Sequence, residues 1–159
     1  YILSVLRERG VDPERAAGAA AESGGSVGEA LRMAADEEHW AFRDQVLRDF
    51  FGCDKRGAIL EISTRWKEKK GEAEKLFSLI ERRLERLLQA RLSGSRPDME
   101  KAGRGIPGEW TAFAEKCELS AFTRLFDGLT EARKHTASAV NFQAITEQLL
   151  MLLMEAKLQ

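Results

Sequence analysis

The chain has 159 residues, of which 43% are hydrophobic and 32% charged, and its formal net charge at pH 7 is −1. This composition is typical of a globular protein of one or two domains, and the nearly balanced charge excludes a wholly basic, histone-like nucleic-acid binder. Leu, Ala, Glu, Lys and Arg dominate while proline is scarce, which favours an all-α fold. Residues 1–39 carry four bases and eight acids whereas residues 40–159 carry 21 and 18, a split that favours two units.

Three short helices are predicted in the first forty residues, at residues 1–9, 13–22 and 27–35. Asp12 followed by Pro13 is an N-cap with proline in the first helical turn, and the helix after it is rich in alanine. A bundle this small is not expected to be stable by itself.

Larger amphipathic helices are predicted in the rest of the chain. They are expected at residues 40–51, 58–66, 72–92, 110–116, 120–136 and 142–158. Asn141 is the predicted N-cap of the last helix. Residues 93–108 contain four glycines and two prolines and predict an exposed loop. The predicted fold class is therefore all-α, with a three-helix unit over residues 1–38 and a helical bundle over residues 39–159.

The most informative segment is the corner around residues 23–31, Ser-Gly-Gly-Ser-Val-Gly-Glu-Ala-Leu. The two glycines are expected to break one helix, and the Ser26 hydroxyl to cap the next. Glu29, at the third helical position, is expected to complete a capping box. This much is local chemistry that any two-helix corner could use.

The corner also resembles the lid subdomain of the clamp-loader branch of AAA+ proteins. There, a Gly-Ser-x-Arg-x-Ala-Leu pattern carries a sensor arginine for ATP, and Gly28 stands at the matching position in this chain. The residues of the resemblance at this corner are Gly25, Ser26, Gly28 and Glu29. The resemblance implies a subunit that lacks this contact with ATP.

The last helix is apolar over most of its circumference and must therefore be covered on more than one side. Two explanations are open: it is the central helix of its own bundle, or one side packs against neighbouring subunits. Its sequence, Val-Asn-Phe-Gln leading into Gln-Leu-Leu-Met-Leu-Leu, resembles the terminal helix of clamp-loader collar domains. We expect subunit contacts from Phe142, Gln143, Thr146, Leu150, Met151 and Met154.

Together the two resemblances cover nearly the whole chain in the order lid (residues 1–38), then collar (residues 39–159). They imply the C-terminal part of a subunit of the delta-prime family of bacterial DNA polymerase III clamp loaders. The implied role is assembly with the gamma/tau and delta subunits, with DNA contact indirect or weak. An isolated fragment would be a possible homo-oligomer, since its interface would lack its partners.

Two alternatives remain open. The first is a gamma/tau-type ATPase fragment of the same architecture, against which Gly28 argues. The second is a helical scaffold unrelated to replication. Because the chain starts at Tyr1 and not at Met, we expect a fragment, and a phosphate-binding loop upstream would favour the ATPase.

Other site types are not predicted. Basic side chains between residues 65 and 91 alternate with glutamates, which favours a salt-bridged helix face over a nucleic-acid surface. The three tryptophans lie in amphipathic patterns and are expected to be core residues, and Trp40 is expected to brace the change from lid to collar. Cys53 and Cys117 are expected to be free thiols of a cytoplasmic protein. We expect no membrane span, no metal site at His39 or His135, no cofactor and no catalytic site, so the fragment is not expected to be an enzyme.

Overall fold

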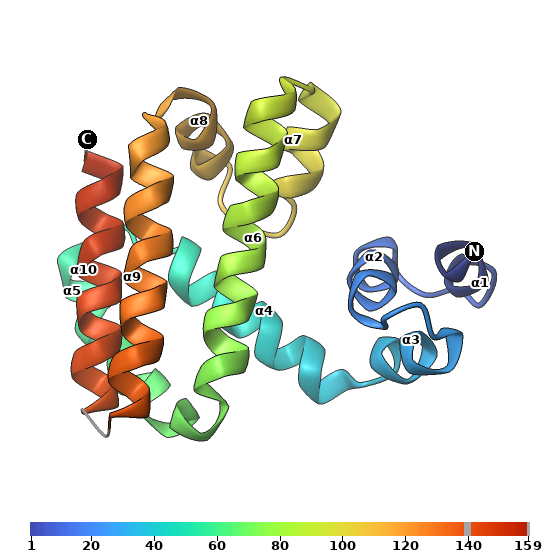
Figure 1. The fold of residues 1–159 in the computed structure, drawn as a ribbon, viewed down its shortest axis with the longest axis horizontal. Helices are drawn as coiled ribbons and strands as arrows, with labels where there is room; N and C mark the ends of the chain where they lie inside the picture. The colour runs from blue at the N-terminus through green and yellow to red at the C-terminus, as the bar shows by residue number, and fades with distance from the viewer. Residues whose placement is uncertain (139–140, 159) are drawn as a thin grey trace. The chain divides into compact units, whose positions relative to one another are not determined.

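The computed structural model describes residues 1–138 and 141–158, and within these ranges every regular element is a helix (Figure 1). The predicted all-α fold class is thereby confirmed. The chain divides into two compact units, Tyr1–Asp44 and Gln45–Gln159. The division falls inside one helix, α4, which spans Glu37–Phe51.

The smaller unit contains three short helices and the first half of α4. These helices are α1 (Ile2–Glu8), α2 (Pro13–Glu22) and α3 (Val27–Ala34). The Asp12 carboxylate caps α2 as predicted, because it accepts from the backbone N–H groups of Glu14 at 3.0 Å and Arg15 at 3.2 Å. Asp36 caps α4 in a similar way, accepting from the His39 N–H at 3.1 Å.

The core of the smaller unit is built around Trp40. It consists of Leu6, Ala16, Ala19, Ala30, Ala34 and Trp40. The Trp40 indole N–H donates to the Met33 carbonyl at 2.8 Å. The indole ring lies against Gly18, where an added Cβ would meet the ring at 3.0 Å. Small residues on α2 and α3 thus make room for one large ring. Trp40 lies after residue 38, where the sequence predicts the end of the three-helix unit, yet it packs within the smaller unit.

Two ion pairs join α2 to the start of α4. Arg15 binds Glu37 at 2.6 Å, and Arg43 binds Glu14 at 2.8 Å. Both guanidinium groups also lie over the Trp40 ring, 5.7 Å and 5.2 Å from its centroid. The hydrogen bond from Arg15 lowers the pKa of the Glu37 carboxyl.

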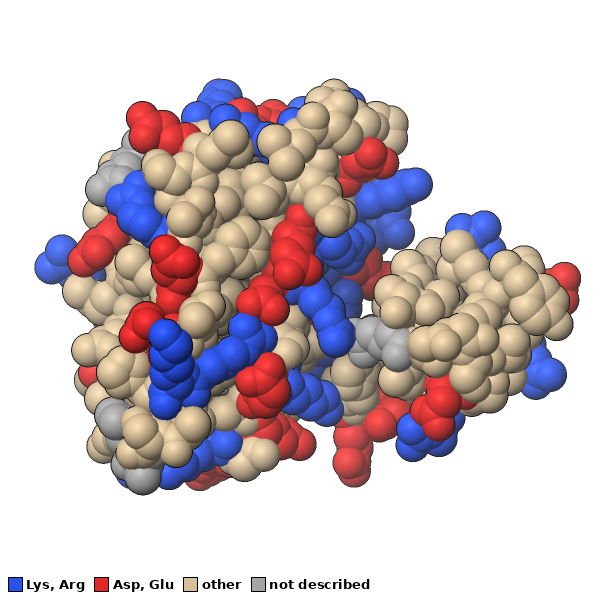
Figure 2. Space-filling model, viewed as in Figure 1, with Lys and Arg blue, Asp and Glu red and all other residues tan. Residues whose placement is uncertain are grey.

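The larger unit is a helical bundle that begins with the end of α4. Its other elements are α5 (Arg56–Trp66), the 3-10 helix η1 (Lys67–Glu72), α6 (Ala73–Ser93), α7 (Arg96–Ala102), α8 (Glu109–Lys116), α9 (Leu119–Ala137) and α10 (Phe142–Leu158). In Figure 1, α9 lies between α6 and α10, and α5 packs on α10. The largest fully buried side chains include Trp66, Trp110, Phe50, Phe51, Phe77 and Phe122. Charged side chains of both signs are interspersed over the face shown in Figure 2.

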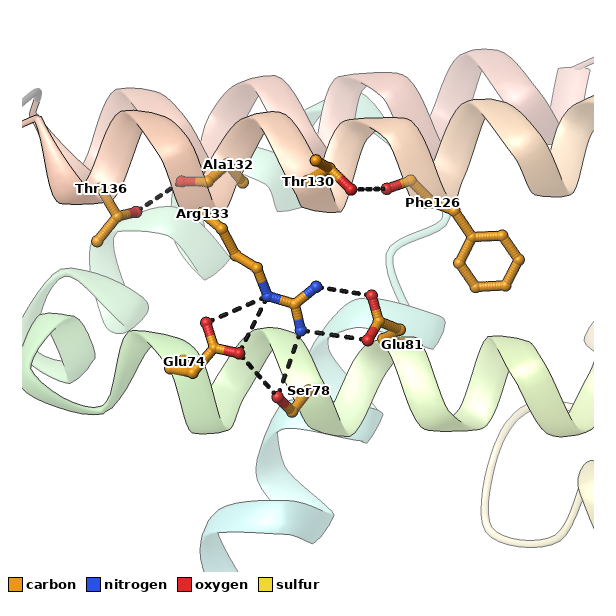
Figure 3. Close-up of polar contacts among 8 residues, drawn as sticks. All are labelled: Glu74, Ser78, Glu81, Phe126, Thr130, Ala132, Arg133 and Thr136. Carbon is orange, nitrogen blue, oxygen red and sulfur yellow. Dashed lines mark hydrogen bonds and ion pairs between the residues drawn. The ribbon is translucent and has the colours of Figure 1, made fainter.

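An arginine of α9 connects that helix to α6 (Figure 3). Arg133 donates to Glu81 at 2.6 Å, to Glu74 at 3.1 Å and to the Ser78 hydroxyl at 3.3 Å. The hydrogen bond to Glu81 is the main cause of a raised pKa of the Arg133 guanidinium. The charged face of α6 therefore forms ion pairs with a second helix.

The prediction of an exposed loop over residues 93–108 is wrong, because the segment contains α7. The Ser95 hydroxyl caps this helix by accepting from the Asp98 N–H at 3.3 Å. Pro97 lies in the first turn, where a missing N–H costs nothing. Met99 and Ala102 are buried, so the helix packs one face on the bundle. The proline and glycine content of this segment thus predicts a loop where the structure has a short amphipathic helix.

Three arginines of α6, Arg83, Arg86 and Arg91, donate to backbone carbonyls. Arg83 is only 3% exposed and donates to the Arg104 carbonyl at 2.6 Å. Arg91 donates to the carbonyl of Ala114 in α8 and to that of Cys117, the residue that ends this helix. The prediction of a solvated, salt-bridged helix face for this basic stretch is therefore wrong for Arg83 and Arg91, which are part-buried and connect α6 to the polypeptide around α7 and α8.

Candidate functional site

The corner before α3 has the predicted cap. Gly24 and Gly25 have φ angles of +60° and +89°, a conformation that L side chains rarely adopt. These two positions, just after the end of α2, therefore have a backbone conformation that favours glycine. The Ser26 hydroxyl then accepts from the Glu29 N–H at 3.2 Å and begins α3.

The second half of the predicted capping box is not formed at this corner, and the prediction of a full box is wrong. The Ser26 N–H donates to the Ser23 carbonyl at 3.2 Å, which already satisfies it. The Glu29 carboxylate binds Arg32, one turn further along α3, at 2.5 Å. Its hydrogen bond raises the pKa of the Arg32 guanidinium. Glu29 thus strengthens the first turn of the helix through a neighbour of opposite charge.

Gly28 lies exposed in the first turn of α3. An added Cβ would meet only the Ser26 Oγ, at the ordinary contact distance of 3.9 Å. Neither packing nor a positive φ angle therefore requires glycine at this position. The corner would accommodate a side chain where the sequence places none.

Three of the six residues expected to contact other subunits are buried in the larger unit. Phe142 is 4% exposed, and Thr146 and Leu150 are 0% exposed. Phe142 packs against Phe77 of α6, with 6.1 Å between the ring centroids. The expectation is wrong for these three side chains, because the bundle itself covers them.

The other three expected contact residues lie nearer the surface. Met151 is 37% exposed, and Gln143 and Met154 are partly buried. The Gln143 side chain donates to the Thr64 hydroxyl of α5 at 3.1 Å, so it also serves the bundle. The surface of α10 that remains exposed for contact with another molecule is therefore one narrow strip that includes Met151.

This strip borders a groove of about 650 Å³ between α9 and α10, which we call the α9–α10 groove. Its lining residues are Gly128, Glu131, Ala132, His135, Ala144, Ile145, Glu147, Gln148, Leu149, Met151, Leu152 and Glu155. Of the expected contact residues, only Met151 is among them. The contribution of α9 was not predicted, although Gly128, a residue without a side chain inside a predicted helix, was a signal for a close approach of another helix.

The remaining tryptophans are core residues, as predicted. The Trp66 indole N–H donates to the Asp49 carboxylate at 3.0 Å, and that of Trp110 donates to the Phe51 carbonyl at 2.6 Å. Both side chains are 0% exposed. A base therefore has no access to either ring for stacking.

Both cysteines are free thiols, as predicted. Cys53 is buried and Cys117 partly buried, and burial is the main cause of a raised pKa at each. At Cys117 the neighbouring Arg91 opposes this shift without cancelling it.

Among the described residues, no three or more His, Cys, Asp or Glu side chains lie together as metal ligands would. Over the same ranges, each helix is either too short or too polar to cross a membrane. Two places remain as candidate sites, the capped corner at Gly28 and the α9–α10 groove. The chain was compared with protein-family models, with curated proteins and with solved structures, and none of them matches it.

Proposed function

We propose that this chain is an assembly component of a bacterial replicative clamp loader, of the delta-prime type. In this role the larger unit would act as a collar that joins the gamma/tau and delta subunits, and the smaller unit as the end of an AAA+ lid. The chain would support loading of the sliding clamp on primed DNA in the cytoplasm without itself hydrolysing ATP.

The observation that carries the proposal is the incomplete covering of α10. This helix is apolar on nearly every side, yet α5 and α9 leave a strip around Met151 and the α9–α10 groove uncovered. Uncovered apolar surface beside a polar rim is typical of protein contact sites. A terminal helix that packs inward on one side and outward on the other suits a component of an assembly.

Gly28 supports the choice of a non-ATPase subunit over a gamma/tau-type ATPase. The family pattern has an arginine at this position, and the corner has room for one. The absence of a side chain here is thus a property of this sequence and not a requirement of its fold. A subunit that positions its neighbours has no need of this contact with ATP.

Assembly can be measured directly by mixing the chain with gamma and delta subunits and determining the mass of the complex by light scattering. We expect a mass that corresponds to a complex containing all three proteins. Persistent monomers at micromolar concentrations would overturn the proposal and favour a helical scaffold unrelated to replication. ATP binding that depends on this chain would favour the gamma/tau-type alternative.

A further inference from the structure

The α9–α10 groove has an apolar floor. Ile145 and Leu149 lie at its base, and Leu152 and Met151 lie nearer to solvent. Gly128 contributes no side chain to the α9 wall, and the Leu152 side chain packs into the space beside it, where an added Cβ would lie 2.3 Å from the Leu152 Cδ2 atom. An apolar floor of this kind accepts aliphatic side chains.

The rim of the groove is acidic. Glu131, Glu147 and Glu155 line it, and no Lys or Arg is among its lining residues. Glu131 lies within 3.4 Å of Lys134 and 3.5 Å of His135. These contacts compensate one of the three carboxylates in part, so the rim keeps a net negative charge.

The groove is about as long as a short helix. Its lining residues on α10 run from Ala144 to Glu155, which corresponds to about 16 Å at a rise of 1.5 Å per residue. This is about three helical turns. On α9 the lining residues Gly128, Glu131, Ala132 and His135 follow the spacing of one helix face.

We propose that the α9–α10 groove binds an amphipathic helix of another protein, with an apolar stripe toward the floor and Lys or Arg on both flanks. This inference deepens the proposed function, on which it rests only for the identity of the protein that supplies the helix. Aliphatic side chains at positions i, i+3, i+4 and i+7 would cover Leu152 and Met151. The basic flanks would pair with the three glutamates and favour the correct partner.

A second copy of this chain is the less suitable occupant. In a contact between two equal grooves, each acidic rim would face another acidic rim, and like charges placed opposite each other disfavour association. The chemistry of the groove therefore points to a partner of opposite charge.

The inference can be tested with a synthetic helix of about 14 residues that carries a leucine stripe flanked by lysines. Fluorescence anisotropy of the labelled peptide with the full 159-residue chain measures affinity, and amide NMR shifts locate the site. We expect saturable binding with shifts confined to residues 128–135 and 144–155. Peptides with glutamate in place of lysine, or with the same residues scrambled, serve as controls and should bind much more weakly.

Variants of the groove sharpen the test. Replacing Glu131, Glu147 and Glu155 by Gln should weaken peptide binding about tenfold at low salt. Met151→Ala should also weaken it, whereas Leu60→Ala, which removes another exposed apolar side chain on α5, should not. Glu85→Gln, on the exposed face of α6, is the control for the loss of one carboxylate outside the groove. Circular dichroism would verify that each variant is folded.

The outcomes separate this inference from the proposed function. Absence of peptide binding, or binding that the groove variants leave unchanged, would overturn the inference. If the triple Gln variant forms the complex with gamma and delta equally well, the inference about the groove is overturned while the proposed function stands. Peptide binding in the groove without any complex would overturn the proposed function alone. A dimer of this chain that the triple Gln variant strengthens would replace the inference with self-association.

Discussion

Gly128 of α9 faces Leu152 of α10 so closely that an added Cβ at position 128 would lie 2.3 Å from the Leu152 Cδ2 atom. The next atom, Leu149 Cδ1, is at an ordinary distance of 3.6 Å. The close approach of these two helices therefore depends on one glycine and one leucine side chain. Both residues line the α9–α10 groove, so this contact also shapes the candidate binding surface.

Gly128→Ala tests this contact. Overpacking costs about 1–3 kcal/mol, while the better helix propensity of alanine contributes about 1 kcal/mol in the opposite direction. We expect a net loss of about 1 kcal/mol in the free energy of unfolding, measured with urea. In a Leu152→Ala background the same change should be stabilising, because the clash is gone. If Gly128→Ala changes the free energy of unfolding equally in both backgrounds, the Leu152 side chain does not cause the clash.

Asp49 is expected to be one of the most sensitive polar positions of the larger unit. Its buried carboxylate accepts from the Trp66 indole at 3.0 Å and from the Gln45 amide at 2.9 Å, and it pairs with Arg65. Asp49→Ala would leave these donors without their acceptor, at a cost of about 2–4 kcal/mol. Glu61→Ala removes an exposed carboxylate near the same Arg65 and should cost under about 1 kcal/mol. Similar losses for both variants in urea unfolding would contradict this account.

Arg133 is expected to stabilise the fold through the geometry of its guanidinium group as well as through its charge. Arg133→Lys keeps the charge but cannot reproduce the forked contacts with Glu81 and Glu74, so a loss of about 1 kcal/mol is expected. Lys134→Met, which breaks an exposed pair with Glu131, should change stability by less than about 0.5 kcal/mol. Thermal unfolding followed by circular dichroism measures both. An Arg133→Lys variant as stable as the parent would show that charge alone suffices.

Gly28→Arg should leave the fold intact. The position is exposed and has space, so the free energy of unfolding should change by no more than about 0.5 kcal/mol. Gly25→Arg is the matched control, because φ at Gly25 is +89° and any side chain there is strained. This control should cost about 1–2 kcal/mol. A strongly destabilised Gly28→Arg protein would mean that the fold, and not the function, requires glycine at position 28.

The two thiols predict a loss of stability at alkaline pH. Burial raises the pKa of Cys53 and of Cys117, so the folded state holds each thiol proton more tightly than the unfolded chain does. Their contribution is complete below the ordinary pKa of a thiol and is lost as the pH rises through the raised value. The free energy of unfolding should therefore fall as the pH rises above the ordinary pKa of a thiol. A variant with both cysteines changed to Ala should show a flatter profile; an unchanged slope would assign the loss to other groups.

Much of the helical pattern follows from local chemistry and could be predicted. Asp12, Ser26 and Asn141 each cap the helix that the sequence places after them, and Asn141 accepts from the Ala144 N–H at 3.2 Å. Caps and apolar periodicity involve residues within a few positions of one another, so they can be read without the fold. The helix α7 was not predicted because it is stabilised by burial of Met99 and Ala102 where it packs with α6 and α8, which a composition rich in glycine and proline does not reveal.

The candidate site was less predictable. The sequence marks α10 as apolar all round but does not tell which side the bundle covers, and Phe142, Thr146 and Leu150 proved to be interior residues. Which strip stays open depends on where α5 and α9 pack, and these contacts join residues far apart in the chain.

By itself, therefore, the sequence determined the all-α class, the helix caps and the glycine at position 28, because each rests on residue type and short-range spacing. Only the tertiary structure decided that Gly128 would meet Leu152, that Arg83 would bind a backbone carbonyl, and that three glutamates would border one apolar groove. These features arise when segments distant in sequence pack together, and the packing of whole helix faces, not any local pattern, selects them.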